Sequence, residues 1–288
     1  MNEAVDLNIN HLREWIGKTE TLSDQITPVP MAALSVTLDR NDPLPHAGDL
    51  LPPLWSWLYF LPLHRHSEIG RDGHAKKGGF LPPVPLPRRM FAGDRMQFHR
   101  PLRVGDRIYR TSTIGDVSYK EGRTGPLVFV VVRHEIQNSE GLAVIEEHDI
   151  VYRDQSSAPG GVQKSQTPPG PAAWTREIQP DAVMLFRYSA LTFNGHRIHY
   201  DRKYATEVEG YPGLVVHGPL IATLLLDLLR RNLPDAVVAR FAFRAVKPLF
   251  DIAPFLVCGR VEEDKKSIRL WASDAAGDLA MDATAVLA

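Results

Sequence analysis

The segment Leu220–Leu229 is apolar at nearly every position, and it constrains the fold more than any other part of the chain. A helix that is apolar all round is buried inside its domain. Gly218 stands at the expected cap and Pro219 at the expected first helical residue, while Asn232-Leu233-Pro234 ends the pattern. We therefore expect a buried helix here, with the rest of this half of the chain folded around it.

The same plan occurs twice along the chain. Runs rich in β-branched and aromatic residues follow the predicted helix at Val237–Lys247, Pro254–Glu262, Ser267–Asp274 and Ala280–Leu287. In the first half, an apolar helix candidate at Leu54–Leu61 precedes similar runs at Arg95–Leu102, Asp106–Val117, Leu127–Gln137 and Leu142–Arg153. The sequence thus predicts an α+β fold made of two copies of one module, each a buried helix wrapped by an antiparallel sheet.

The two halves are unequal, and a linker is expected between them. Gln155–Ala172 contains four Pro, three Gly and three Ser, a composition typical of linkers. We therefore divide the chain into an N-terminal module at 1–154, a linker at 155–172 and a C-terminal module at 173–288. The first half also carries an insertion at Pro62–Gly93 with a Pro-rich run, Gly78–Arg89. Because that run is apolar and internal, we expect a packed loop rather than a ligand for an SH3 domain.

The bulk composition excludes several classes of function. Over 288 residues, 33 Lys+Arg against 34 Asp+Glu leave a net charge of −1, so no global field favours nucleic acid or an anionic membrane. No apolar stretch approaches the length of a membrane span, and the acidic N-terminus does not resemble a secretory signal. The single cysteine, Cys258, excludes an internal disulfide and is expected to be a buried strand residue. These features favour a cytoplasmic protein.

The densest polar cluster, Thr192–Asp201, contains Asn194, His196 and His199, and His217 follows just before Gly218. The start of a helix carries free N–H groups and a positive dipole end, which stabilise negative charge. A glycine there lets a carbonyl oxygen approach closely. A nearby histidine can move a proton to or from water. His217 is explained equally well as a residue that packs beside the helix start.

Other sites that these residues could form are less well supported. His196 and His199 form a His-x-x-His pair, but zinc would need a third and a fourth ligand, and no spacing supplies them, so we expect no metal. His64 and His66 lie in the insertion and are expected at the surface. No serine has a nucleophile-elbow pattern, and no Gly-rich loop fits a nucleotide. We therefore expect no cofactor.

The segment Phe186–Leu220 resembles the MaoC-like, R-specific enoyl-CoA hydratase family. That family carries Asp-x-Asn-Pro-x-His, a short helix, and then a helix start similar to Ala-His-Gly-Met-Leu. The family's histidine falls on His199 and its helix-start glycine on Gly218. The aspartate position holds Asn194, which is a departure because a neutral amide is not a useful base. The positions of the family's Asn and Pro hold His196 and Arg197.

The variant Phe193–Asp201 more closely resembles one branch of that family. This branch includes mitochondrial 3-hydroxyacyl-thioester dehydratases and bacterial mesaconyl-C4-CoA or itaconyl-CoA hydratases. Arg100–Asp106 and Gly122–Val128 also resemble it. The resemblance implies a double hotdog fold in which the C-terminal module is catalytic and the degenerate N-terminal module shapes an acyl tunnel. It also implies an acyl-CoA thioester as substrate, with a homodimer as one expected assembly.

The activity implied is that of a hydro-lyase. The enzyme would hydrate an enoyl-CoA, such as mesaconyl-C4-CoA or itaconyl-CoA, to citramalyl-CoA, or dehydrate a 3-hydroxyacyl-CoA. We expect His199 to remove a proton from water, the Asn194 amide to orient that water and the Gly218 N–H to hold the thioester oxygen. The residues expected to contact the substrate, its carboxylate or the coenzyme A phosphates are His196, His217, Arg88, Arg89, Arg197 and Arg202. Solvated charge explains each of these arginines equally well.

Two other functions remain open at this point. A hotdog thioesterase would bind a similar thioester but release free coenzyme A. A non-catalytic acyl-CoA binding protein would account for the lost aspartate at position 194. Release of thiol distinguishes the first function, and tight binding without turnover distinguishes the second.

Overall fold

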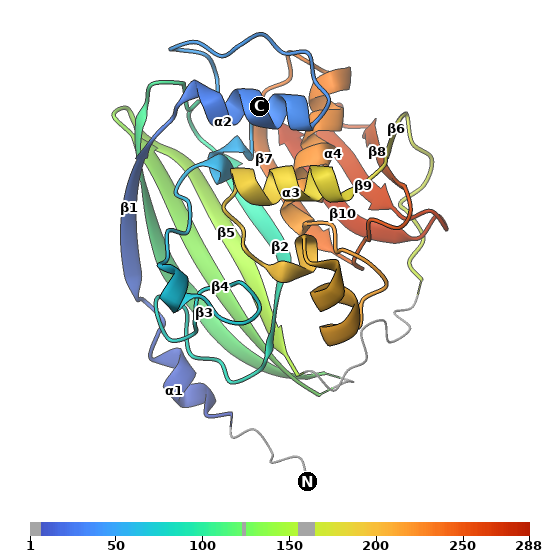
Figure 1. The fold of residues 1–288 in the computed structure, drawn as a ribbon. Coiled ribbons are helices and arrows are strands. Elements are labelled where there is room, and N and C mark those ends of the chain that lie inside the picture. Colours follow the sequence, from blue (N-terminus) through green and yellow to red (C-terminus); the bar gives the residue numbers. More distant parts are fainter. Residues whose placement is uncertain (1–6, 123–124, 155–164) are drawn as a thin grey trace.

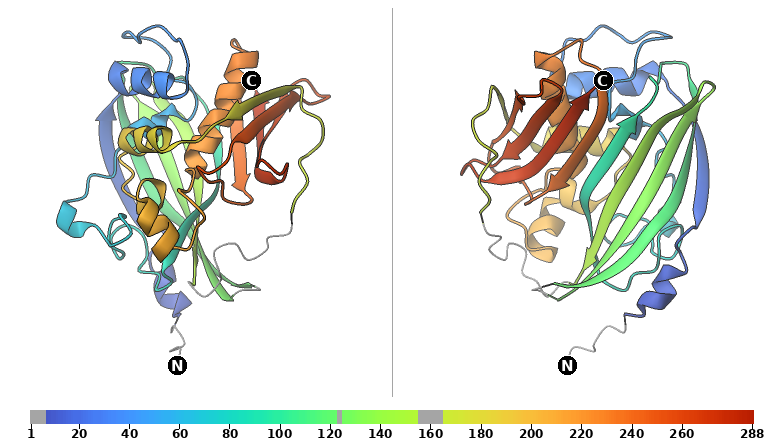
Figure 2. Two further views of the ribbon diagram at one scale, coloured as in Figure 1. Left: turned by 45° about the vertical axis from the view of Figure 1, so that its right-hand side comes forward. Right: turned by 180° about the vertical axis from the view of Figure 1, so that it is seen from behind.

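The computed structural model describes residues 7–122, 125–154 and 165–288, which form one curled antiparallel sheet with helices against its inner side (Figure 1, Figure 2). The sheet has ten strands in the order β1-β3-β4-β5-β2-β7-β10-β9-β8-β6. The first five strands are β1 (Thr19–Gln25), β2 (Arg88–Phe98), β3 (Arg107–Gly122), β4 (Gly125–Asn138) and β5 (Gly141–Arg153). The second five are β6 (Trp174–Ile178), β7 (Val238–Ala245), β8 (Phe255–Val261), β9 (Ser267–Ser273) and β10 (Leu279–Leu287).

The strand order is the same in both halves when each is read outward from the centre. β2 and β7 pair antiparallel at the centre, and β1 and β6 form the two outer edges. At this junction a Cβ on Gly93 would lie 2.5 Å from the Phe243 carbonyl oxygen, so the two backbones meet where only glycine fits. The predicted repeat is therefore confirmed as two equivalent sheets joined edge to edge.

The predicted buried helix is α4 (Gly218–Asn232), in which every residue from 220 to 229 is buried. His217 is its N-cap, so the helix begins one residue earlier than the sequence indicated. Asp227 is the one ionisable residue in that buried stretch, and it accepts hydrogen bonds from Arg40, Arg176 and Arg231. These arginines come from the segment after α2 (Pro28–Thr37), from β6 and from α4 itself, so the carboxylate joins three distant segments.

The expected first-half helix, Leu54–Leu61, is wrong in length. Only a single 3-10 turn, η1 (Trp55–Leu58), forms there. Leu54 and Phe60 have φ values of 69° and 55°, and a residue in that left-handed conformation cannot continue a right-handed helix. The N-terminal half therefore fills its interior with the side chains around this short turn instead of a long helix.

Several elements were not anticipated from the sequence. They are β1, β6, α1 (Ile9–Arg13), α2, α3 (Ala182–Leu191), η2 (His66–Glu68) and η3 (Arg197–His199). The π-helical turn η4 (Tyr204–Val208) lies where the resembled family carries a short helix. α2 and α3 follow the first strand of each half and pack against each other (Figure 1). They therefore extend the repeat.

The insertion was partly misassigned. Its last residues, from Arg88 onward, belong to β2, so the loop ends earlier than predicted. Val84 and Leu86 in the Pro-rich run are fully buried, as expected for a packed loop, while His64 and His66 are exposed. Cys258 is a buried residue of β8, also as expected. The expected linker lies largely in 155–164, outside the described residues, and the module boundaries stay a prediction.

In the part of the chain that the structure describes, no helix combines the length and the apolar character that crossing a bilayer requires.

Candidate active site

The segment between α3 and α4 folds back so that its histidines lie against the start of α4. Phe193, with φ 51°, turns the chain directly after α3. The Asn194 side-chain carbonyl then accepts the His196 backbone N–H at 3.0 Å, which closes a tight turn. The short helix η3 follows and places His199 inside the protein. A backbone hydrogen bond from Val215 to Ile198, at 2.9 Å, ties this turn to the strand-like residues before α4.

His199 is buried and held in one tautomer. Its Nδ1 lies 2.7 Å from the Val215 carbonyl oxygen. A carbonyl can only accept, so Nδ1 carries the hydrogen and Nε2 keeps its lone pair. Burial lowers the pKa of His199 to about 4. At neutral pH the residue is therefore a neutral imidazole with one free basic nitrogen.

His217 supports the ring of His199 from one face. The two rings are stacked, with centroids 3.7 Å apart and planes 18° apart. His217 Nε2 lies 2.8 Å from the Ser189 hydroxyl, and burial lowers the pKa of His217 well below its ordinary value. These contacts favour the interpretation that His217 packs beside the helix start.

Gly218 begins α4 beside the aromatic side chain of Phe91. A Cβ on Gly218 would lie 3.2 Å from Phe91 Cδ1, so the position has little room for a side chain. Phe91 belongs to β2 of the other half and lies 4.4 Å from His148 and 5.3 Å from Phe243, ring to ring. The start of the C-terminal helix thus faces a wall that the N-terminal half supplies.

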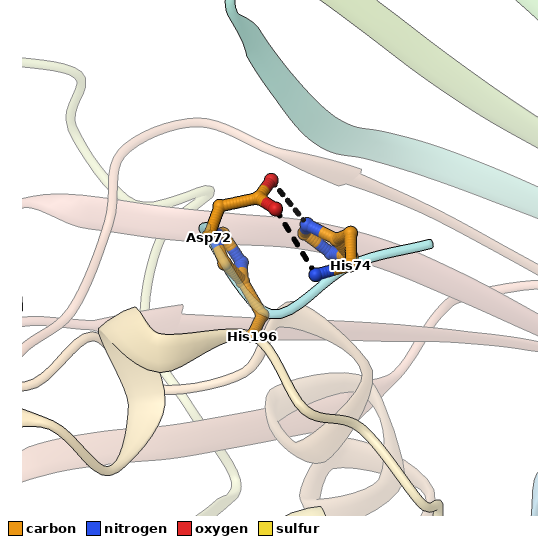
Figure 3. A group of neighbouring side chains, drawn as sticks. All are labelled: Asp72, His74 and His196. Atoms are coloured by element: carbon orange, nitrogen blue, oxygen red, sulfur yellow. Dashed lines mark hydrogen bonds and ion pairs between the residues drawn. The ribbon is translucent and has the colours of Figure 1, made fainter. Parts of the chain in front are cut away.

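The insertion brings two residues to this site that the sequence did not indicate. His74 stacks on His196 with ring centroids 4.0 Å apart, and His196 stands edge-on to His199 at 5.4 Å. Asp72 accepts two hydrogen bonds from His74, one from the backbone N–H at 3.1 Å and one involving Nδ1 at 3.0 Å (Figure 3). The unusual length of the insertion was the signal that could have pointed to it.

Close backbone contact fixes the insertion against the segment that carries Asn194 and His199. A Cβ on Gly73 would overlap the Gly195 carbonyl oxygen, and a Cβ on Gly195 would lie 2.8 Å from the Gly73 carbonyl oxygen. The Arg197 N–H donates to the Asp72 carbonyl oxygen at 2.9 Å. These contacts require glycine at both positions and hold His74 in place beside His196.

Two groups of side chains in the described residues have donor atoms within 4.8 Å of one another, a spacing that a metal ion could bridge. One is Asp72, His74 and His196, and the other is His134, Glu146 and His148 in the N-terminal half. In the first group, Asp72 and His74 are the additional potential metal ligands beside His196 that the spacing in the sequence did not reveal. However, the Nδ1 of His74 is already engaged by Asp72, so an ordinary hydrogen-bonded pair explains that contact.

The basic residues fall into two classes. Arg88 contacts Glu209, Arg197 contacts Asp201, and Arg202 contacts Asp251, so each already has a carboxylate partner. Arg89 differs, because none of the described carboxylates forms an ion pair with it, and it is half-buried. Burial is the largest cause that lowers the pKa of His196, followed by the neighbouring histidines, and the positive charge of Arg89 lowers it further. Arg89 is therefore a cation beside the histidine cluster.

The comparison with protein families decides the identity. Residues 54–251 match the family described as hydroxyacyl-thioester dehydratase type 2, a span that contains all the residues of this site. The chain belongs to this family. Members of the hydroxyacyl-thioester dehydratase type 2 family are hydro-lyases, so the protein is an enzyme that adds or removes water at an acyl thioester.

Two curated relatives match most of the chain. A mesaconyl-C(4)-CoA hydratase from Chloroflexus aurantiacus is 48% identical over 95% of this chain and 96% of the relative. The mitochondrial hydroxyacyl-thioester dehydratase type 2 of Schizosaccharomyces pombe is 27% identical over 82% of this chain and 88% of the relative.

Solved structures confirm the predicted double hotdog fold for this family member. A MaoC-like dehydratase superposes with a TM-score of 0.68 at 14% identity, covering 94% of this chain and 98% of that one. A Mycobacterium tuberculosis protein described as having a double hotdog fold gives 0.59 at 13% identity, covering 95% and 96%. At these identities the likeness shows the fold alone.

Proposed function

We propose that the enzyme hydrates mesaconyl-C4-CoA to citramalyl-CoA and catalyses the reverse dehydration. The full-length similarity to a mesaconyl-C(4)-CoA hydratase supports this substrate. The observation that carries the mechanism is His199, a buried neutral imidazole whose Nδ1 is fixed by the Val215 carbonyl. Its free Nε2 can accept a proton from water near the start of α4.

Hydration by this site would need one proton to move twice. His199 Nε2 takes a proton from water while the water oxygen forms a bond to the β-carbon. The electron pair of the double bond moves through the α-carbon onto the thioester oxygen, and the Gly218 N–H at the helix start stabilises that charge. The imidazolium of His199 then gives its proton to the α-carbon as the thioester carbonyl re-forms. No proton is gained or lost over the cycle.

Asn194 and His217 would assist without exchanging protons. The Asn194 carbonyl oxygen already accepts the His196 N–H, and its NH₂ group would orient the water as a donor to the water oxygen. His217 would hold the His199 ring in its orientation by stacking against one face of it. The acid–base work therefore falls on His199.

One assay tests the proposal against its alternatives. Purified enzyme is mixed with mesaconyl-C4-CoA, and the absorbance of the conjugated thioester and the release of free thiol are followed together. A hydratase removes the conjugated absorbance without releasing thiol. Thiol release would indicate a thioesterase, and binding without either change would indicate an acyl-CoA binding protein. Either result would contradict the proposal.

The cellular location and the assembly are further parts of this proposal. A single cysteine that is free and buried suits the reducing cytoplasm. The expectation of a homodimer comes from the family resemblance alone. Cell fractionation tests the location, and light scattering on the purified chain tests the assembly.

A further inference from the structure

We propose that His74, His196 and Arg89 form a subsite for a carboxylate bonded directly to the β-carbon of the enoyl thioester. This inference rests on the proposed function, because it assigns the specificity for a β-carboxylated acyl group. It adds a residue of the insertion, His74, to the substrate-binding surface of the C-terminal half.

The position of such a carboxylate follows from the chemistry of the substrate. In mesaconyl-C4-CoA the free carboxylate is attached to the same carbon that water attacks. That carbon must lie near His199, whose Nε2 activates the water. Its carboxylate then lies in the first layer of side chains next to His199. The His196 ring, 5.4 Å from the His199 ring, belongs to that layer, and His74 stacks behind it.

The two histidines are suited to donate to an anion. Burial lowers the pKa of His196 to about 2. Burial also lowers the pKa of His74, and the charge of Arg89 adds to this effect while Asp72 opposes it. In the free enzyme both rings are therefore neutral, and His196 has one N–H to donate to an anion. The one N–H of neutral His74 is the Nδ1–H that it gives to Asp72, so its Nε2 can donate only when the ring is protonated. A bound carboxylate would raise both pKa values, and the imidazolium of His74 would then offer its Nε2–H to that carboxylate.

Arg89 supplies the positive charge that would balance the substrate carboxylate. Its neighbour Arg88 is paired with Glu209, whereas no ion pair joins Arg89 to a carboxylate of the described residues. Burial raises the pKa of the Tyr152 phenol, and the charge of Arg89 and its hydrogen bond to the phenol oppose that rise. The guanidinium therefore reaches the interior side of β2 and β5. A half-buried cation without a counter-ion gains from an anionic ligand, and a guanidinium matches the two oxygens of a carboxylate.

The other charged groups near the histidines are already committed. The Asp72 carboxylate accepts from the His74 backbone and ring, and so orients that ring. The Lys77 ammonium donates to the carbonyl oxygens of Val84 and Leu86, and thereby anchors the insertion. Among the described residues, Arg89 is thus a guanidinium of this cluster that has no carboxylate partner, and a substrate carboxylate would supply one.

The test compares two substrates that differ only at the subsite. 3-Methylcrotonyl-CoA carries a methyl group where mesaconyl-C4-CoA carries the carboxylate. For mesaconyl-C4-CoA we expect Arg89→Gln and His74→Gln to lower kcat/KM by about 10–100-fold, mainly through KM, as for lost hydrogen bonds to a charged group. Their effect on 3-methylcrotonyl-CoA should stay within about twofold. Arg71→Gln, an exposed side chain in the same insertion, is the matched control and should change neither.

Binding measurements separate this inference from the proposed function. Calorimetry gives the affinities for citramalyl-CoA and for 3-hydroxy-3-methylbutyryl-CoA, its methyl counterpart, without requiring turnover. Tighter binding of citramalyl-CoA by the wild type, lost in Arg89→Gln, would support the subsite even if mesaconyl-C4-CoA were not hydrated. Equal losses for both ligands, or no loss, would overturn the subsite while leaving the hydratase intact. A divalent metal that co-purifies with the wild type and is lost in His74→Gln would also overturn it.

Discussion

The free nitrogen of His199 should determine the acidic limit of the reaction. Because burial lowers the pKa of His199 to about 4, the base is already unprotonated at neutral pH. Activity should fall only as the pH drops through about 4, where the imidazolium forms and can no longer accept a proton. Without the burial, the fall would lie near pH ~6.5, the ordinary value for histidine. The pH dependence of kcat/KM measures this limb.

Substitutions at two positions check this assignment. His199→Ala should lower turnover by about 10²–10⁴ and abolish the acidic limb. Asn194→Asp should move the limb to higher pH, because a nearby anion stabilises the imidazolium. A limb that persists unchanged in His199→Ala would show that another group titrates.

A side chain at Gly218 should disturb the thioester oxygen. Gly218→Val would press against Phe91, which lies 3.2 Å from the position of a Cβ, and would shield the N–H at the helix start. The loss of one such donor lowers kcat by about 10²–10³. Single-turnover kinetics and thermal melting of the variant would separate this effect from misfolding. Phe91→Leu in the same variant should restore the fold but not the rate, and full recovery of the rate would contradict the oxyanion role.

At the scale of residues, the sequence indicated part of the candidate site and missed the rest. Asn194, His199 and Gly218 could be proposed because they lie in one segment, Phe186–Leu220, that resembles a known family. Asp72 and His74 could not, because they precede His196 by more than a hundred positions and no local pattern marks them. Their contact with His196 depends on the two glycines, Gly73 and Gly195, where the backbones touch, which is a tertiary property.

Among the elements, α4 depends on one buried carboxylate. Asp227 is 5% exposed and pairs with Arg40 and Arg176 at 2.8 Å each and with Arg231 at 2.7 Å. Asp227→Asn would leave three guanidinium groups without their common partner. Removing one member of a buried ion pair costs about 3–5 kcal/mol, and we expect a loss of this size in the free energy of unfolding.

Chemical denaturation measures that loss, and an exposed ion pair provides the control. Lys203 and Glu207 lie 3.9 Å apart with most of both side chains exposed. Glu207→Gln should therefore change stability by less than about 1 kcal/mol. Equal effects of the two substitutions would show that the Asp227 cluster does not hold the helix.

Strands were easier to predict than helices in this chain. In β4, alternate residues Val128, Val130 and Val132 are buried, so the pattern of a half-buried strand is present in the sequence. β1 has no buried residue at all, and its sequence therefore carries no such signal. α2 contains two prolines in its first turn, and prolines weaken the sequence signal for a helix.

For the whole molecule, the pairing of β2 with β7 should make each half depend on the other. A fragment 170–288 would expose the edge of β7 that pairs with residues 93–97 in the intact chain. An open strand edge favours association with another chain. We expect this fragment to aggregate or self-associate, as measured by light scattering during gel filtration. A monomeric fragment that unfolds cooperatively would show that the C-terminal half is an independent domain.

The inequality of the two inner helices affects how this enzyme can evolve. In a dimer of identical single-module subunits, one gene segment would encode both modules. A mutation would then change both modules at once. Here the long helix beside His199 and the strand that carries Arg89 are encoded separately, in opposite halves of one gene. With the roles proposed for these residues, selection could vary Arg89 or His74 while His199 stays constant. Such a chain could then acquire new acyl substrates and keep the same acid–base residue.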